Sequence, residues 1–281
     1  MFFLQLLFNR SIVRVRLTFT VKNRGALVPF HHQFLIAREI KEILARHADS
    51  DLITYPFYSF SGLKGQTRLG NNGLHFNSRR VTIVVSSASE EFLDLLLKSI
   101  LDTDFLKIGE LVLKPEFADK ELPVNLDHGT KYVCISPLIL DFSEVDDDFP
   151  FVDPASNEFS DLLYESTIER MTEYGIDVST IQDVQKFQLV PDAGYVNKMK
   201  SSGKKYSRIY PTFQQGRRQE VRGYTLPFTL FAAPEIQDFV FTCGLGENCS
   251  NGFGLLDLAN SNPTERTVTY AVNESSNSAG N

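Results

Sequence analysis

Cysteine is scarce in this sequence, and its scarcity excludes two common kinds of cross-linked site. The chain of 281 residues contains three cysteines, Cys134, Cys243 and Cys249, and no two of them form a CxxC pair. A disulfide framework or a cysteine-ligated zinc site requires more cysteines at closer spacing. We therefore expect a protein of the reducing cytoplasm that binds no metal through cysteine.

Long apolar runs are also missing. No stretch of about eighteen consecutive apolar residues, the length needed to cross a bilayer, occurs in the sequence. The stretch Met1–Ser11 contains a short apolar run, but neither a basic n-region nor a small-residue cleavage site accompanies it. We therefore expect no removed signal peptide and no membrane partner. The hydrophobic content of 42% is enough to fill one large core or two modest ones.

Positive charge is low overall but locally concentrated. The formal net charge of −7 argues against a protein that coats nucleic acid indiscriminately, because phosphate binding is mainly neutralisation by lysine and arginine. Residues 141–183 are acidic with Arg170 as their only base, whereas residues 198–222 carry eight bases against one acid, Glu220. Such a stripe is either a solvated hairpin face or a surface for an anionic partner, and its single sign favours the partner.

The first part of the chain alternates between strand and helix patterns. Ser11 to Val21 alternates from Val13 onward, with apolar residues on one face and Arg14 and Arg16 on the other, which is typical of a half-buried strand. Helical spacing predicts two amphipathic helices, His31–Arg46 and Ser89–Leu101. Further strands are predicted at Ile53–Phe60, Leu74–Phe76, Val81–Ser86 and Lys107–Phe117. This order is that of a split β-α-β, or ferredoxin-like, unit.

The second part repeats this order more loosely. We predict helices at Asn157–Tyr174 and, shorter, at Pro234–Asp238. Strands are predicted at Lys131–Leu140, Val184–Val190, Tyr206–Thr212, Val221–Phe231 and Phe239–Cys243, and a last one, Phe253–Leu258, follows a glycine-rich loop. The expected fold is therefore α+β, with two tandem ferredoxin-like domains at residues 11–120 and 130–258 and a linker between them. Residues 259–281 are rich in serine, asparagine and threonine, and we expect them to form a disordered tail.

The glycine-rich loop follows the segment Phe239–Cys243. It contains Gly244, Gly246, Gly252 and Gly254, and glycine suits positive φ angles and close approach of a ligand. We expect a bare loop whose N–H groups face outward and can hold phosphate. No Lys-Ser/Thr pair follows, and the next segment is too short and apolar to open a dinucleotide-binding helix, so neither nucleotide-binding motif fits.

The pattern Gly-Leu-Gly, five residues, Gly-Phe-Gly resembles the signature of the CRISPR-associated RNA-processing proteins of the RAMP superfamily. The filler with Ser250 and Asn251, together with Phe253, is most similar to the branch of repeat-cleaving endoribonucleases, the Cas-six family. The segment Tyr132–Leu140 resembles the Ser-Pro strand of the same branch, and the likeness covers about residues 12–258.

The resemblance implies a metal-independent endoribonuclease that cuts CRISPR repeat RNA into guide RNAs, with the ribose 2′-OH as internal nucleophile. It implies no cofactor, repeat RNA as partner, subunits of a CRISPR effector complex as further partners, and a monomer or homodimer. Two alternatives stay open. One is a noncatalytic RAMP subunit that holds guide RNA, and the other is an unrelated α/β protein whose glycine loop binds another ligand.

Cleavage of RNA without a metal needs a base, an acid and cations, and histidine suits both proton transfers near neutral pH. His47 is the first candidate, because the resemblance places a catalytic histidine in this helix-to-strand loop. His32 is the second, although an architectural role at the helix start is implied for it, and both His31 and His32 are placed to cap the helix.

The second catalytic group stays open between Lys41, Tyr55, Tyr58 and Lys64, with Lys41 offered by the helix. The candidate RNA-binding residues are Gly244, Gly246, Ser250, Asn251, Gly252, Phe253 and Gly254 in the loop, and Lys204, Lys205, Arg208, Arg217 and Arg218 in the basic stripe.

Overall fold

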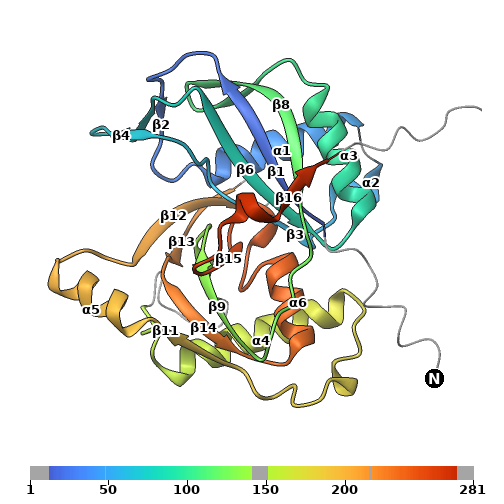
Figure 1. Cartoon of the computed structure of the whole chain (residues 1–281), viewed down its shortest axis with the longest axis vertical. Coiled ribbons are helices and arrows are strands. Elements are labelled where there is room, and N and C mark those ends of the chain that lie inside the picture. The colour runs from blue at the N-terminus through green and yellow to red at the C-terminus, as the bar shows by residue number, and fades with distance from the viewer. Residues whose placement is uncertain (1–12, 48, 141–150, 215–216, 271–281) are drawn as a thin grey trace, which may run out of the picture.

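A computed structural model describes residues 13–47, 49–140, 151–214 and 217–270. Figure 1 shows two α+β halves, one above the other, with the chain passing from the first to the second near residue 125 and returning near its C-terminal end. The predicted α+β class is confirmed. No helix within the described ranges is both long and apolar enough to cross a membrane.

The first half is built on an antiparallel sheet with the strand order β16-β8-β1-β6-β3, with β7 paired to β8. Its strands are β1 (Val13–Val21), β3 (Tyr58–Phe60), β6 (Arg80–Ser87), β7 (Leu106–Ile108), β8 (Leu111–Glu121) and β16 (Thr267–Thr269). A smaller sheet joins β2 (Leu27–Val28), β5 (Leu74–Phe76) and β4 (Thr67–Leu69). Helices α1 (Gln33–His47) and α3 (Glu90–Leu101) pack on one face of the main sheet, with the short α2 (Ser50–Ile53) after α1.

The apolar alternation of β1 explains this packing. Val15, Leu17 and Phe19 are fully buried and share one core cluster with Ile36 and Ile40 of α1. Helix α3 begins as the sequence predicts, because the side chain of Ser89 accepts a hydrogen bond from the Phe92 N–H. The predicted strand–helix–strand order of this half is therefore confirmed.

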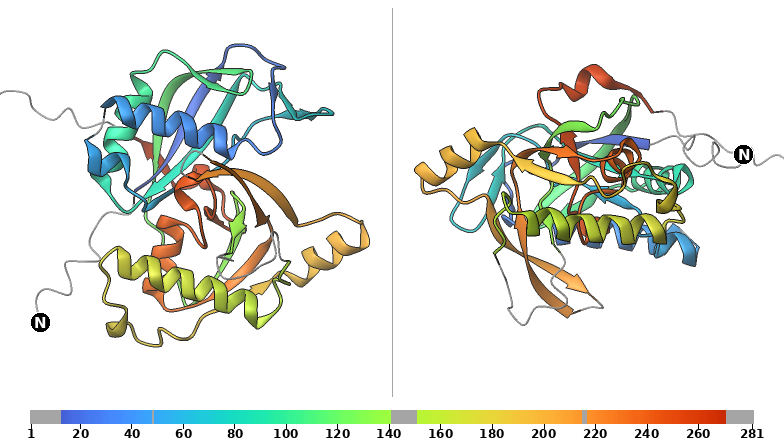
Figure 2. Two further views of the ribbon diagram at one scale, coloured as in Figure 1. Left: turned by 180° about the vertical axis from the view of Figure 1, so that it is seen from behind. Right: turned by 90° about the horizontal axis from the view of Figure 1, so that it is seen from below.

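The second half contains two sheets. One has the order β11-β14-β9-β15 and the other β10-β13-β12. Their strands are β9 (Gly129–Cys134), β10 (Leu138–Ile139), β11 (Gln188–Pro191), β12 (Ser207–Gln214), β13 (Arg217–Tyr224), β14 (Pro227–Phe231) and β15 (Leu256–Leu258). The helices are α4 (Asn157–Glu173), α5 (Ala193–Ser201) and α6 (Pro234–Cys243), with the 3-10 turns η2 (Val178–Thr180), η3 (Cys249–Asn251) and η4 (Pro263–Arg266). Figure 2 shows α4 running along one side of this half.

Several predicted elements of this half were wrong in detail. The segment Phe239–Cys243 forms the end of α6 rather than a strand. The short helix predicted at Pro234–Asp238 therefore continues to Cys243. A contiguous apolar run fits either a strand or a buried helix, and here it is the buried end of a helix that begins at Pro234. The predicted strand Val221–Phe231 is divided between β13 and β14, which belong to different sheets. Helix α5 was not foreseen.

Residues 259–270 are ordered, although the sequence predicts a disordered tail over residues 259–281. Residues 267–269 form β16, which pairs antiparallel with β8 through Thr267 and Glu121. The β-branched residues Thr267, Val268 and Thr269 suit an edge strand, and the polar composition around them concealed that pattern. The chain therefore returns to the first sheet after completing the second half (Figure 1). The rest of the predicted tail, residues 271–281, lies outside the described residues.

A network of buried charges joins the two halves on the sheet face opposite to α1 and α3. Arg14 is 2% exposed, and its Nε lies 3.0 Å from Glu121 Oε2. Arg16 Nη2 lies 3.2 Å from Glu121 Oε1, and Arg266 Nη2 lies 2.9 Å from Asp257 Oδ1. The Arg14 guanidinium also lies 4.6 Å from the centre of the Phe241 ring in α6. The second face of β1 is therefore covered, whereas the sequence predicts a strand that is only half buried.

Candidate functional site

The glycine-rich loop lies where the two halves meet. It follows α6 and includes η3, which packs against β3 and α1 of the first half. The Ser59 hydroxyl in β3 donates a hydrogen bond of 2.7 Å to the Phe253 carbonyl oxygen. The loop is thus fixed to the first half rather than projecting from the second.

All four glycines have positive φ angles, as the sequence predicts: 87° at Gly244, 79° at Gly246, 88° at Gly252 and 71° at Gly254. All four are also buried. A Cβ atom at Gly246 would collide with the carbonyl oxygen of Ile139, and one at Gly252 would collide with the Phe60 ring. The glycines therefore allow close packing against other parts of the protein.

The N–H groups of this loop do not form an open cradle for phosphate. The Gly244 N–H donates to Val240 O, and the Leu245 N–H donates to Gly254 O. The Gly254 N–H donates to Pro137 O at 2.7 Å. The expectation of outward-facing N–H groups is contradicted at these positions, because each of these groups donates to a backbone carbonyl oxygen of the protein.

Arg170 holds the start of the loop from α4. Its Nη2 donates to the Cys243 carbonyl oxygen at 2.8 Å, and its Nη1 donates to the carbonyl oxygens of Gly244 at 2.8 Å and Gly246 at 3.0 Å. These acceptors include the C-terminal end of α6, where backbone carbonyls lack helical partners. In the sequence Arg170 stands out as the only base of an acidic segment, but no local pattern connects it to the loop.

The predicted loop residues divide into buried and accessible members. Phe253 is 1% exposed and packs on Tyr210 of β12, with ring centres 5.9 Å apart. Tyr210 and Ile139 enclose the ring, so the burial of Phe253 argues against a direct contact with RNA, and its assignment as an RNA-binding residue stays a prediction. Ser250 and Asn251 in η3 remain partly exposed.

Helix α1 contacts the loop through a hydrogen bond between two of the predicted site residues, Lys41 and Asn251. Lys41 Nζ donates to Asn251 Oδ1 at 2.6 Å, and the Asn251 amide donates to Asn248 Oδ1. Desolvation lowers the pKa of Lys41. A predicted catalytic group and a predicted RNA-binding group therefore meet across the boundary of the two halves.

His47 is the last residue of α1 and is exposed. It lies six residues after Lys41, and at about 100° and 1.5 Å per residue the two side chains leave the helix about 120° and 9 Å apart. The helix therefore presents the two groups on different sides.

His32 has an architectural environment. It is 5% exposed, its Nε2 accepts a hydrogen bond from the Leu63 N–H at 3.0 Å, and its Nδ1 lies 3.1 Å from Pro29 O. Burial lowers the pKa of His32, which favours the neutral ring with the proton on Nδ1. Both nitrogens are engaged by the backbone, so this histidine is poorly placed for proton transfer to RNA.

His31, which the sequence marked only as a possible cap, lies in the junction. Its ring meets the Tyr210 ring edge-on at 4.4 Å between centres. Burial and then the positive charge of Arg208 lower the pKa of His31. The sequence contains no signal for this contact, because Tyr210 and Arg208 belong to a strand far along the chain.

The basic stripe does not lie on one face of the hairpin. Lys204 and Lys205 are exposed just before β12, and Arg208 is exposed within it. Arg218 is opposite Phe213, and since strand residues alternate, Arg208 and Arg218 project from opposite faces. Arg218 is also paired with Glu220 at 3.2 Å. Arg217 begins β13.

Metal-binding groups are not gathered in the described parts of the chain. No set of three or more histidine, cysteine, aspartate or glutamate side chains there is close enough to hold an ion.

The fold of the two halves is that of a known structural class. Solved structures of the RAMP type share the fold, which consists of two tandem ferredoxin-like domains. A Cas6-related protein from Pyrococcus furiosus matches with a TM-score of 0.71 and 17% identity, over 90% of this chain and 100% of that one. A RAMP protein described as binding different RNA substrates matches with a TM-score of 0.70 and 19% identity, over 88% of this chain and all of that one.

A third structure, described as CRISPR-associated protein Cas6, matches with a TM-score of 0.69 and 17% identity, over 89% of this chain and all of that one. The family model for the C-terminal region of CRISPR-associated protein Cas6 matches residues 119–258. No curated protein matches the sequence. Through this C-terminal region the chain belongs to the Cas6 family. The alternative of an unrelated α/β protein is thereby removed.

Proposed function

We propose that this protein is an endoribonuclease that cleaves CRISPR repeat RNA in a precursor transcript without a metal ion. The observation that carries the proposal is the hydrogen bond between Lys41 and Asn251. It joins a cation on α1 to the glycine loop in a chain whose second half matches the Cas6 model. A phosphate bound at this junction would touch both halves of the protein.

The proposed reaction is an internal transesterification, in which the phosphorus of the RNA exchanges its bond to the 5′-oxygen for a bond to the 2′-oxygen. The 2′-oxygen attacks the adjacent phosphorus while a base takes its proton, and the 5′-oxygen leaves with a proton from an acid. The products are a 2′,3′-cyclic phosphate and a 5′-hydroxyl. His47 is the proposed proton-transfer group, because it is an exposed imidazole on the same helix as Lys41.

Lys41 would stabilise the negative charge of the pentacoordinate phosphorus. Lys41 and His47 leave α1 on different sides. To reach a phosphate beside His47, the Lys41 ammonium must therefore leave Asn251 and extend along the helix. RNA binding would therefore break the Lys41–Asn251 hydrogen bond before cleavage.

A noncatalytic RNA-holding subunit is the second candidate. The separation of Lys41 from His47, together with the engagement of both His32 nitrogens, favours it. Incubation of labelled repeat RNA with the protein in EDTA separates the two. Cleavage supports the endoribonuclease, and stable binding without cleavage supports the holding subunit. Effector subunits as partners and the choice between monomer and homodimer stay predictions.

The direct test of the catalytic assignment is His47→Ala. Loss of a proton-transfer group should lower the single-turnover rate by about 10² to 10⁴, while RNA affinity stays within about threefold of the parent. His75→Ala is the matched control, because His75 lies in β5 with its Nδ1 2.8 Å from Gly25 O. If His47→Ala cleaves within about tenfold of the parent, His47 is not the catalyst. His31 then becomes the next histidine to replace, ahead of His32.

A further inference from the structure

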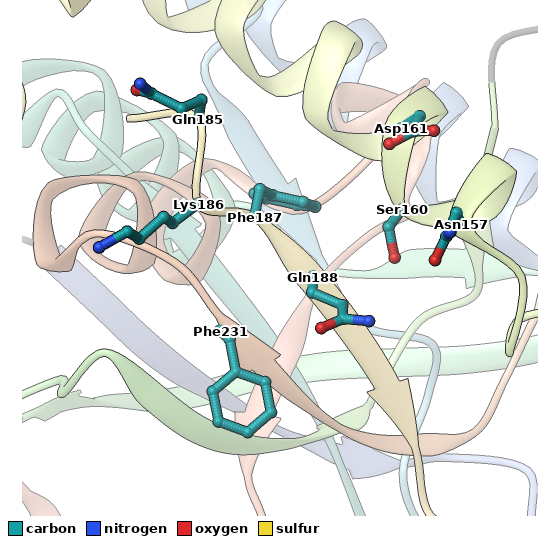
Figure 3. A pocket seen from close by; sticks show the side chains of 8 residues that line it. All are labelled: Asn157, Ser160, Asp161, Gln185, Lys186, Phe187, Gln188 and Phe231. Atoms are coloured by element: carbon teal, nitrogen blue, oxygen red, sulfur yellow. The ribbon is translucent and has the colours of Figure 1, made fainter. Parts of the chain in front are cut away.

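A cavity of roughly 320 Å³ opens at the edge of the second half, and none of its lining residues belongs to the glycine loop. Figure 3 shows it between the first turns of α4, the segment entering β11 and the last residue of β14. Its lining residues are Asn157, Ser160, Asp161, Gln185, Lys186, Phe187, Gln188 and Phe231. We call it the α4–β11 pocket.

The walls of the α4–β11 pocket are fixed by contacts with the rest of the half. The Ser160 hydroxyl, which is buried, accepts a hydrogen bond from the Leu189 N–H at 3.0 Å and so ties α4 to β11. The Phe187 ring packs on Tyr164 with ring centres 5.7 Å apart. The pocket is thus formed before any ligand binds.

Two aromatic rings line this pocket, and one is unusually open. Phe231 is 48% exposed at the end of β14, and its ring lies directly over Gly129 of the neighbouring strand, where a Cβ would come within 3.0 Å of it. The strand therefore supports the ring while leaving it accessible. An exposed ring held on a sheet is a platform on which an unstacked nucleobase packs.

The polar lining suits the edge of a base. Carboxamides both donate and accept hydrogen bonds, and Asn157 and Gln188 supply two of them beside Ser160, while Gln185 lines the far end with its amide turned away from them (Figure 3). The Asp161 carboxylate only accepts at neutral pH, so it pairs with an exocyclic amino group and repels phosphate. The cavity exceeds the volume of one base and is far smaller than a folded RNA stem.

We propose that the α4–β11 pocket binds one unstacked base of single-stranded RNA, and that the base carries an exocyclic amino group. This inference rests on the proposed function for the presence of RNA. Phe231 stacks on the base, the carboxamides contact its edge, and Asp161 accepts from its amino group. Adenine, cytosine and guanine each carry such an amino group, whereas uracil has none for Asp161.

The backbone of the bound nucleotide lies at the rim of the α4–β11 pocket. Lys186 is exposed there and forms an ion pair of 3.0 Å with Asp183, with the lysine side chain 73% exposed. Exposed pairs of this kind are weak. Lys186 can therefore exchange Asp183 for the phosphate next to the bound base.

Phe231→Trp tests the site directly, because the chain contains no tryptophan and the new fluorescence reports on this position alone. Titration with single-stranded tetramers of adenosine or cytidine should quench the emission saturably, and uridine tetramers should require at least about fivefold higher concentration. Phe105→Trp is the control, since Phe105 is 51% exposed in the other half. Equal quenching in both variants, or none at Phe231→Trp, overturns the proposal.

Asp161→Asn in the Phe231→Trp background tests the source of the base preference. Asparagine keeps the size of the side chain and adds a donor, so the preference for adenosine and cytidine over uridine should fall to within about twofold. An unchanged preference would remove Asp161 from base recognition and overturn that part of the assignment. Glu158→Gln is the matched control, because Glu158 lies on the same turn of α4 outside the pocket lining.

A third measurement separates this site from the proposed nuclease activity. Phe231→Ala should weaken binding of the full repeat by at least about fivefold, while the single-turnover cleavage rate at saturating RNA is unchanged. Quenching in Phe231→Trp with no cleavage by the parent protein would leave the site standing and remove the nuclease. Cleavage by the parent with no quenching would do the reverse.

Discussion

Two sets of cations in this protein differ in what surrounds them. Arg14, Arg16 and Arg266 share the carboxylates of Glu121 and Asp257 in a largely buried network. Lys204, Lys205 and Arg208 are exposed at the start of β12. A buried cation is tolerated only when it is paired, whereas an exposed one is available to an anionic partner. The buried arginines therefore fix the two halves, and the exposed cations are the set that we predict to contact RNA.

The largest expected effect concerns the buried set. Arg14→Ala removes the cation that lies 3.0 Å from Glu121 and stacks on Phe241, and it leaves a buried carboxylate short of a partner. Breaking a buried pair in this way costs about 3–5 kcal/mol of unfolding free energy. Urea denaturation followed by circular dichroism measures the loss.

Arg80→Ala is the control for this prediction. Arg80 pairs with Glu116 at 2.6 Å, but its side chain is 62% exposed, so its removal should cost less than about 1 kcal/mol. Equal losses in Arg14→Ala and Arg80→Ala would show that burial does not distinguish the two pairs.

Two glycine variants test whether the glycine loop serves packing or RNA contact. Gly246→Ala places a Cβ against the Ile139 carbonyl, whereas Gly203→Ala has a similar φ of 64° and open space around it. Both variants carry the strain of a positive φ, and Gly246→Ala should lose roughly 1–3 kcal/mol more stability because of the collision.

Thermal unfolding and RNA binding of Gly246→Ala and Gly203→Ala decide whether the loop glycines serve packing or RNA contact. A third variant, Gly252→Val, adds to this test. From the sequence alone, Gly252→Val is predicted to lose RNA affinity at an unaltered melting temperature. The burial of all four glycines predicts the opposite, a lower melting temperature with affinity retained in the folded fraction. A normal melting temperature for Gly246→Ala with lost affinity would restore the earlier expectation.

The sequence predicts local features well because they depend on neighbouring residues. The alternation in β1, the Ser89 cap and the positive φ angles of the loop glycines follow from residue type and spacing. The contacts that build the junction do not. Lys41 and Asn251 were each named, but no local pattern places a residue of α1 beside η3.

The same limit explains the errors. A positive φ at Gly252 indicates that a side chain is disfavoured there. It does not indicate whether the space that the side chain would fill is occupied by RNA or by the Phe60 ring. Arg14 alternates with apolar residues like any exposed strand residue, and only the return of Asp257 and Arg266 from the end of the chain buries it. Such information is carried by tertiary packing rather than by composition.

Asp238 provides a smaller test of the rule that buried charges need counter-ions. Burial, and then the negative charge of Glu235, raise the pKa of Asp238 to about 6. The folded protein therefore holds a proton that the unfolded chain has released between about pH 4 and pH 6, so this group's contribution to stability is complete below that window and is lost as the pH rises through it.

Asp238→Asn should remove this loss. The variant should match the parent near pH 4 and exceed it by about 1 kcal/mol above pH 7, a figure discounted because the carboxylate is partly solvated. Urea denaturation at a series of pH values measures the difference. A constant difference across the range would mean that Asp238 titrates normally and that its burial carries no electrostatic cost.

The smallest effect on stability, and the sharpest on RNA, is expected for the exposed cations. Replacing Lys204, Lys205 and Arg208 together by alanine should leave the melting temperature nearly unchanged and reduce the slope of log affinity against log salt by about 2, since each lost contact to single-stranded phosphate contributes about 0.7. The matched control replaces Lys98, Lys107 and Lys114, which are also exposed and remove the same charge from the first half. If both triple variants change the slope equally, the effect follows net charge and the start of β12 contacts no phosphate. A change confined to the first variant would locate the RNA backbone beside His31 and Tyr210, because Arg208 is the cation that acts on His31.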